Sequence, residues 1–282
     1  MINKRIIARL DVKNNSLVKG IHLEGLRVLG SPEKFAQKYY EDGVDEIIYM
    51  DVVASLYGRN SLSELVKETA KNIFVPLTVG GGIRNLHDVG LLLKSGADRV
   101  CINTAAVNNP QLITDIVNRY GSSTLVVAIE TIKTDGKFKV FIDNGREYTG
   151  LDVEDWIKKI EGLGAGELLI TSVDREGTGS GLDYELIDLI ISKVKIPFIA
   201  HGGIGGSKDF IDAFSKDGIN AICASSVFHY QALDELRDVD TKLEGNKDFL
   251  MSGRINTKIK GTSINNLKAQ LESNKIQARY VD

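Results

Sequence analysis

The sequence VGGGIR at residues 79–84 recurs as AHGGIG at residues 200–205. Each copy follows a short apolar run and precedes a pattern typical of an amphipathic helix. Cys101 in VCINTA recurs as Cys223 in AICASS at nearly the same separation. One pair of glycine turns arises easily by chance, but several matched landmarks at one offset indicate that the chain consists of two similar halves.

Short runs of strand-forming residues alternate with amphipathic helical patterns along the chain. We expect strands near residues 5–11, 46–51, 74–80, 99–103, 125–130, 167–173, 197–201 and 221–225. We expect helices over residues 31–43, 61–72, 85–96, 109–121, 153–164, 183–194 and 207–218. This alternation predicts an α/β protein, a closed (β/α)8 TIM barrel. An open doubly wound sheet also alternates but gives no reason for the repeat. We therefore expect one domain over residues 1–282, with half-barrels of about 1–120 and 121–282.

The composition is that of a soluble globular protein, with 282 residues, 43% of them apolar and 26% charged, and a net charge of −3. This charge gives no sign of a nucleic-acid or membrane surface. No apolar run is long enough to span a membrane, and Asp11 interrupts the first one too early for a signal peptide. We expect a cytoplasmic protein without metal or cofactor, in which Cys101 and Cys223 are buried free thiols.

The sequence after the eighth strand departs from the repeat. Residues 231–262 are polar and weakly periodic, whereas residues 262–282 are typical of a capped final helix with a short end. We interpret residues 231–262 as an insertion in the last strand–helix unit. It is either a surface elaboration or a segment that contacts a partner.

Glycine turns after the seventh strand form a candidate phosphate site, because barrels of this kind favour phosphates at the carboxyl ends of their last strands. Gly202 and Gly203 would let backbone N–H groups approach an anion, and residues 205–207 lead into a helix N-terminus. Ala224 and Ser225 end the neighbouring strand.

The first half carries the same features in residues 80–82, Asn103 and Thr104. A single glycine pair is explained equally well by a tight turn, but two pairs at the repeat offset favour two phosphate sites. They predict a long ligand with a phosphate at each end. Residues 175–181, REGTGSG, are expected to form a mobile loop that closes over one end.

Two acids occur where packed strands end. Asp11 ends the first strand and Glu130 the fifth, and alternation directs both side chains inward. Strands one and five face each other across an eight-stranded barrel, so we expect the two carboxylates to point at each other between the phosphate sites. Opposed carboxylates beside a substrate are suited to general acid–base catalysis. The alternative is two solvated acids at strand ends.

Several segments resemble one known family, the cyclase subunit of imidazole glycerol phosphate synthase from histidine biosynthesis. They are KRIIARLDVK, LVKG, TVGGGI, INTAAV, VVAIE, GAGELLITSVDREGTGSG and SVFH. The resemblance covers about residues 1–230 and the final helix. It implies a duplicated half-barrel and a lyase that takes ammonia from a glutaminase subunit docked at the N-terminal barrel face. The ammonia would pass through the barrel to a bis-phosphate ribulosyl-formimino substrate, giving imidazole glycerol phosphate and an aminoimidazole carboxamide ribotide.

The resemblance also implies roles for single residues. Asp11 and Glu130 match the catalytic pair. Lys19 and Asp51 match residues of the family's site, and its phosphate ligands match Gly82, Asn103, Thr104, Gly177, Gly203, Ala224 and Ser225. To this substrate- and phosphate-binding set we add Thr171, His201 and Gly202. The ring of charges that gates ammonia entry comprises Arg5, Glu46, Arg99 and Glu167, with Arg99 in place of the usual Lys. Asp98 matches an acid that meets the glutaminase.

Inner positions depart from the family pattern. Glu130 stands in place of an aspartate and is one methylene longer. Arg9 stands where the family usually has Cys, points into the barrel by alternation, and as a buried guanidinium must pair with Asp11 or Glu130. His201 replaces a serine and is either a base that contacts substrate or a hydrogen-bonded pocket filler.

Three functions therefore stay open at this point. The first is the histidine-pathway cyclase with tolerated variation at its centre. The second is a paralogue that uses ammonia to amidinate a sugar for surface glycans. The third is a non-catalytic barrel that binds a phosphosugar.

Overall fold

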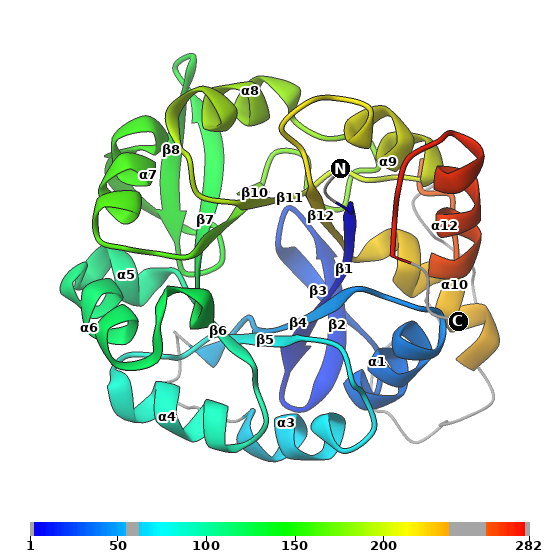
Figure 1. Cartoon of the computed structure of the whole chain (residues 1–282), viewed down its shortest axis with the longest axis horizontal. Helices are drawn as coiled ribbons and strands as arrows, with labels where there is room; N and C mark the ends of the chain where they lie inside the picture. The colour runs from blue at the N-terminus through cyan, green and yellow to red at the C-terminus, as the bar shows by residue number, and fades with distance from the viewer. Residues whose placement is uncertain (1–2, 55–61, 237–257, 280–282) are drawn as a thin grey trace.

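The computed structural model describes residues 3–54, 62–236 and 258–279. Parallel strands close into a barrel ringed by helices, as Figure 1 shows in a view down the barrel. The barrel strands are β1 (Arg5–Lys13), β4 (Glu46–Asp51), β5 (Leu77–Gly80), β6 (Arg99–Ile102), β7 (Leu125–Thr134), β10 (Glu167–Ser172), β11 (Phe198–His201) and β12 (Ala221–Ala224). The pairing of β7 with β10 completes the ring. The expected (β/α)8 barrel is confirmed, and β1 lies opposite β7.

Two antiparallel extensions were not expected from the sequence. β2 (Ser16–Ile21) and β3 (Glu24–Gly30) follow β1, and β8 (Lys137–Ile142) and β9 (Glu147–Asp152) follow β7. The first turn of each extension has positive φ at two residues, 49° and 62° at Asn14 and Asn15, and 52° and 75° at Asp135 and Gly136. Such turns match the twist of a tight hairpin. Each half of the chain therefore extends its first strand over the barrel mouth.

Helices follow the strands around the outside of the barrel (Figure 1). They are α1 (Pro32–Glu41), α3 (Ser63–Ala70), α4 (Leu86–Lys94), α5 (Thr104–Asn108), α6 (Gln111–Tyr120), α7 (Val153–Gly162), α8 (Tyr184–Lys193), α9 (Ser207–Phe214), α10 (Ser226–Leu236) and α12 (Ile264–Ser273). The seven expected helices and the final helix are present, whereas α5 and α10 were not expected. α10 includes the start of the segment 231–262, of which residues 237–257 lie outside the described part of the chain. No described helix has the length and apolar character that a membrane span requires.

Alternation along the strands produces two apolar layers. Ile6, Ala8 and Leu10 of β1 face the helices, where a large continuous core separates the barrel from its outer ring. The barrel interior is a smaller cluster of Ile7, Ile48, Cys101, Val126, Ala128, Leu169, Ile199, Ala221 and Cys223. Both cysteines are buried free thiols, as expected.

The last helix packs against the start of the barrel. Lys268 of α12 forms a buried ion pair with Asp45, with 2.8 Å between Nζ and Oδ1. The other carboxylate oxygen of Asp45 accepts a hydrogen bond from the backbone N–H of Ile6 at 2.7 Å. Lys4 also forms an isolated parallel bridge with Ala278. These contacts fix the N-terminal end of β1.

Candidate active site

A cavity of about 400 Å³ opens at the carboxyl ends of the barrel strands. Parallel barrels bind their ligands at this end, because the βα loops meet there. Six of the residues assigned from the sequence to catalysis or substrate binding line the cavity, namely Asp51, Gly82, Asn103, Thr104, Glu130 and Thr171. The barrel therefore assembles one continuous site from residues that are far apart in the sequence.

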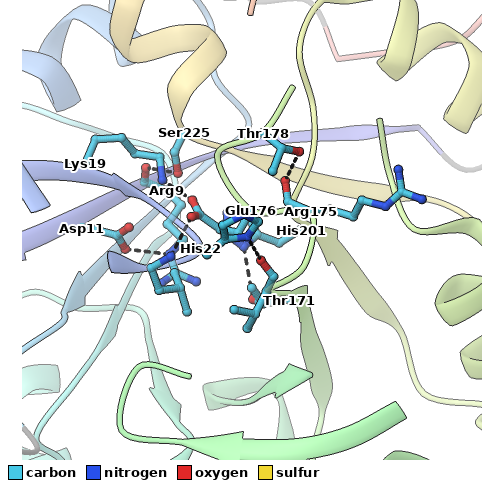
Figure 2. Close-up of polar contacts among 12 residues, drawn as sticks. Arg9, Asp11, Lys19, His22, Thr171, Arg175, Glu176, Thr178, His201 and Ser225 are labelled. Carbon is cyan, nitrogen blue, oxygen red and sulfur yellow. Dashed lines mark hydrogen bonds and ion pairs between the residues drawn. The ribbon is translucent and has the colours of Figure 1, made fainter. Parts of the chain in front are cut away.

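Asp11 is held by an ion pair inside the barrel. Arg9 Nε donates to Asp11 Oδ1 at 2.7 Å, and the two side chains are 2% and 3% exposed (Figure 2). Of the two partners expected for Arg9, the structure selects Asp11. The alternative of solvated strand-end acids does not hold, because Asp11 and Glu130 are both buried.

Glu130 is a buried acid at the end of the opposite side of the barrel. Its Oε2 accepts a hydrogen bond from the backbone N–H of Gly145 at 2.8 Å. Burial raises the pKa of Glu130 to about 7, although the Arg9 charge and the Gly145 N–H act in the other direction. The Asp11 charge adds to the increase. A carboxyl group in this range can both donate and accept a proton near neutral pH.

The glycine turn after β5 shapes one side of the cavity. Gly81 has a φ of 97°, and a Cβ placed there would lie 2.3 Å from the backbone oxygen of Asp51. Only glycine permits this approach. Next to the turn, Thr104 Oγ1 donates to Asp143 Oδ1 at 3.2 Å, and the buried side-chain oxygen of Asn103 has no hydrogen-bond partner among the described residues. This side of the cavity therefore offers polar atoms to a ligand.

The glycine turn after β11 packs against a second loop. Gly203 has a φ of 103°, and a Cβ on it would lie 2.1 Å from the backbone oxygen of Gly181. Residues 205–207 lead into a helix N-terminus, as expected, but the backbone N–H groups of Gly205 and Gly206 there donate to Asp209 Oδ2 at 2.7 and 3.2 Å.

The remaining residues assigned to this second side are not part of the lining described for the cavity, and all but the half-buried Gly177 are buried. They are Gly177, Gly202, Gly203, Ala224 and Ser225. Ser225 Oγ donates to the backbone oxygen of Arg9 at 3.0 Å.

The loop of residues 173–181 is docked on the β2–β3 extension. Lys19 of β2 forms an ion pair with Glu176, and both side chains are 2% exposed (Figure 2). The second carboxylate oxygen of Glu176 accepts from the backbone N–H of Leu23 at 3.0 Å, and His22 Nδ1 lies 2.7 Å from the backbone oxygen of Val173. The loop that we expected to be mobile is thus docked on this hairpin through buried contacts.

Glu176 was not identified from the sequence. Its only signal there was an acid within a glycine-rich loop, in a chain where Lys19 had no assigned counter-ion.

His201 is a buried, hydrogen-bonded imidazole. Its Nδ1 lies 3.1 Å from Thr171 Oγ1, and only 4% of the residue is exposed. Burial lowers the pKa of His201 well below its usual value, and the charges of Arg9 and Lys19 lower it further. The ring is therefore neutral, so one of its nitrogens donates a hydrogen bond and the other can accept one. This arrangement is that of a hydrogen-bonded pocket residue next to the cavity.

A closed ring of charges lies at the opposite end of the barrel. Arg5 pairs with Glu46 at 2.6 Å and with Glu167, and Arg99 pairs with Glu167 at 2.6 Å and lies 3.6 Å from Glu46. Each residue begins a strand, which is why the fold brings the four together. Next to Arg99, the exposed Asp98 accepts a hydrogen bond from the backbone N–H of Leu77 at 2.8 Å.

Comparison with known proteins shows which protein family this barrel belongs to. The sequence model of the histidine biosynthesis protein family matches residues 5–234. The chain belongs to the histidine biosynthesis protein family. Within the described residues, this family member has no group of His, Cys, Asp and Glu side chains arranged to hold a metal ion.

Several relatives of this family member carry the name imidazole glycerol phosphate synthase subunit HisF. The chain is 57% identical over 211 residues to that of Legionella pneumophila, which covers 74% of this chain and 100% of the relative. It is 44% identical over 233 residues to that of Natranaerobius thermophilus, covering 83% and 93%. It is 42% identical over 261 residues to that of a Thermotoga species, covering 93% and 100%.

Proposed function

We propose that this chain is the cyclase subunit of imidazole glycerol phosphate synthase. The observation that carries the proposal is the near full-length similarity to relatives of that name, 42% to 57% identical. Ammonia adds to the bis-phosphate ribulosyl-formimino aminoimidazole carboxamide ribotide. The reaction gives imidazole glycerol phosphate and aminoimidazole carboxamide ribotide, and the ketone oxygen leaves as water when the imidazole ring closes. The protein acts in the cytoplasm and needs no cofactor for this chemistry.

Asp11 and Glu130 move the protons. The pKa of Glu130, raised to about 7 by burial, lets its carboxyl group donate a proton when ammonia adds and take one back when the ring closes. Arg9 holds the Asp11 side chain in position, with 2.7 Å between Nε and Oδ1. The longer side chain of Glu130 is supported by its hydrogen bond to Gly145, which sets the position of the carboxylate.

The substrate spans the mouth with one phosphate on each side. Gly82, Asn103 and Thr104 bind the first phosphate, and the proposal is supported by their place in the cavity wall. The second phosphate binds at Gly177, Gly202, Gly203, Ala224 and Ser225. Lys19, Asp51, Thr171 and His201 contact the substrate between them. Lys19 and Glu176 connect the hairpin and the loop that border the mouth.

Ammonia enters from a glutaminase subunit at the other end of the barrel. The name of the relatives describes a subunit, and the glutaminase is the partner that the resemblance implies. Arg5, Glu46, Arg99 and Glu167 form the gate, and Asp98 contacts the glutaminase next to it. The apolar barrel interior between the gate and the cavity supports a path for a small neutral molecule.

Two half-barrels account for the layout of the site. A β extension follows β1 and β7, and a glycine turn with positive φ follows β5 and β11. The backbone N–H groups of Arg84 and Gly205, at matching positions, donate to Asp88 and Asp209. These matched details support a duplicated ancestor.

A steady-state assay tests the proposed function. With the bis-phosphate substrate and an ammonium salt, we expect turnover that falls at least about 100-fold in Asp11→Asn and in Glu130→Gln. Glu154→Gln, which changes an exposed acid on α7, serves as the control. Absence of turnover in the folded wild-type protein, together with failure to rescue a histidine auxotroph that lacks its cyclase, would refute the proposal and favour the sugar-modifying paralogue.

A further inference from the structure

The Arg9 guanidinium lies within the barrel interior. Arg9 is 1% exposed and occupies the inward position between Ile7 and Asp11 of β1. Its charge acts on titratable groups of four other strands, which are Cys101 of β6, Glu130 of β7, His201 of β11 and Cys223 of β12. Arg9 also lines the 400 Å³ cavity, together with Glu130 and Thr171.

Most of the hydrogen-bonding capacity of Arg9 is unused. Its side chain makes one hydrogen bond to the described residues, from Nε to Asp11 Oδ1 at 2.7 Å. Nη2 is fully buried and has no acceptor among them. A guanidinium carries five N–H groups, and a buried donor without an acceptor is costly. The position therefore needs a further acceptor when the cavity is filled.

The surroundings of Arg9 define the chemistry of that acceptor. Asp11 already balances the guanidinium charge, and Glu130 adds a second carboxyl group nearby. An anion placed between these acids would be repelled. A neutral oxygen can accept hydrogen bonds from the remaining N–H groups without this electrostatic repulsion. In the proposed function both substrate phosphates bind at the sides of the mouth, which assigns the acceptor to the middle of the ligand.

We propose that the outer nitrogens of Arg9 donate hydrogen bonds to a neutral carbonyl oxygen of the bound substrate, and that this contact selects the substrate. The identity of that substrate rests on the proposed function. It offers two carbonyl groups, the ketone of its ribulosyl arm and the carboxamide of its imidazole ring. The family usually has a cysteine at this position, so the contact is particular to this chain and to relatives that share Arg9.

Calorimetric titrations of the wild-type protein, Arg9→Met and Arg9→Lys test the proposal. The ligands are the bis-phosphate substrate without an ammonia source, aminoimidazole carboxamide ribotide and imidazole glycerol phosphate, which has no carbonyl group. Methionine fills the space without donors, whereas lysine keeps a charged donor. Thermal unfolding of each variant checks that it folds. Where Arg9→Met does not fold, Arg9→Lys carries the comparison.

We expect Arg9→Met to weaken binding of the bis-phosphate substrate at least about tenfold, as expected for loss of a charged hydrogen-bond donor. Arg9→Lys recovers part of that loss, and imidazole glycerol phosphate binds all three proteins equally. A parallel loss for aminoimidazole carboxamide ribotide assigns the contact to the carboxamide, and an unchanged affinity assigns it to the ketone. Equal losses for the substrate and imidazole glycerol phosphate, or no losses, would overturn the proposal.

A second measurement separates this inference from the proposed function. If the wild-type protein binds none of the three ligands, the proposed function fails. The Arg9 contact is then read from the guanidinium N–H resonances of Arg9 in an NMR titration with acetamide, with glycerol as the control. We expect acetamide to shift these resonances and glycerol to leave them in place. Unshifted resonances at saturating acetamide would refute a carbonyl site at Arg9.

Discussion

Lys19 of β2 and Glu176 of the loop after β10 form a buried ion pair between residues 157 positions apart in the sequence. Glu176 also accepts a hydrogen bond from the backbone of Leu23. The pair thus joins an extension of the first half to a loop of the second half at the barrel mouth. Both side chains are almost fully buried. If one partner is removed, water therefore cannot solvate the charge of the other.

Glu176→Gln should therefore destabilise the protein by about 3 kcal/mol, because it leaves the Lys19 ammonium buried without a counter-ion. For a domain of this size we expect the melting temperature to fall by about 6–12 °C. Glu185→Gln is the matched control, since its pair with Lys133 is exposed and should contribute less than about 1 kcal/mol. Equal melting temperatures for the two variants would contradict a buried pair.

Glu130→Gln should stabilise the protein in a pH-dependent manner. The pKa of Glu130 is raised to about 7, so the folded state keeps a proton that the unfolded state releases above its ordinary pKa of 4.5. Wild-type stability therefore falls as the pH rises from about 4.5 to 7, and the cost is complete above that. The gain from Glu130→Gln should be about 2–3 kcal/mol larger at pH 8 than at pH 5. Chemical unfolding at the two pH values measures this difference, and a gain independent of pH would refute it.

Glu167→Gln should open the charged ring, because Glu167 pairs with both Arg5 and Arg99. Without its charge the two arginines repel each other and the entrance loses its order. With the glutaminase partner bound, we expect product formed per glutamine hydrolysed to fall several-fold, while turnover with an ammonium salt falls less. Measuring glutamate and imidazole glycerol phosphate in one assay gives the ratio. An unchanged ratio would mean that the ring does not control ammonia entry.

Gly203→Ala should disturb the second glycine turn. The added Cβ would lie 2.1 Å from the backbone oxygen of Gly181, and the φ of 103° is unfavourable for alanine. Gly136→Ala is the control, because its φ is 75° and nothing lies within 4 Å of its Cβ position. The control should lose about 1–2 kcal/mol from backbone strain alone, and Gly203→Ala at least about 1 kcal/mol more from overpacking. Denaturant unfolding compares the two, and equal losses would show that the turn and the loop can separate.

The barrel strands were predictable because a buried strand between helices leaves a strong apolar signature. The extensions were less visible, because the sequence of β8, KFKVFI, ends in three successive apolar residues and no residue of β9 is buried. Asp135–Gly136 was a hairpin signal within reach of the sequence. α10 was missed because its buried residues, such as Val227, Phe228 and Ala232, do not follow one helical stripe.

The positions of the site residues were more predictable from the sequence than the contacts between their side chains. Strand alternation and barrel closure were sufficient to predict that Glu130 faces the cavity, whereas Asp11 is buried in its pair with Arg9 and is not part of the described lining. The sequence left two partners open for Arg9, because both acids were near it in register. The pairing of Lys19 with Glu176 depends on how the βα loops fold over the mouth. No local sequence pattern indicates that these two residues come together.

Asp45 receives its buried counter-ion from Lys268, 223 positions later in the sequence. A chain emerging from the ribosome therefore carries this acid through almost the whole of synthesis before its partner exists. The N-terminal end of β1 can reach its final structure only after the last helix has left the ribosome. Nascent chains stalled before α12 should consequently remain sensitive to proteases at their first strand.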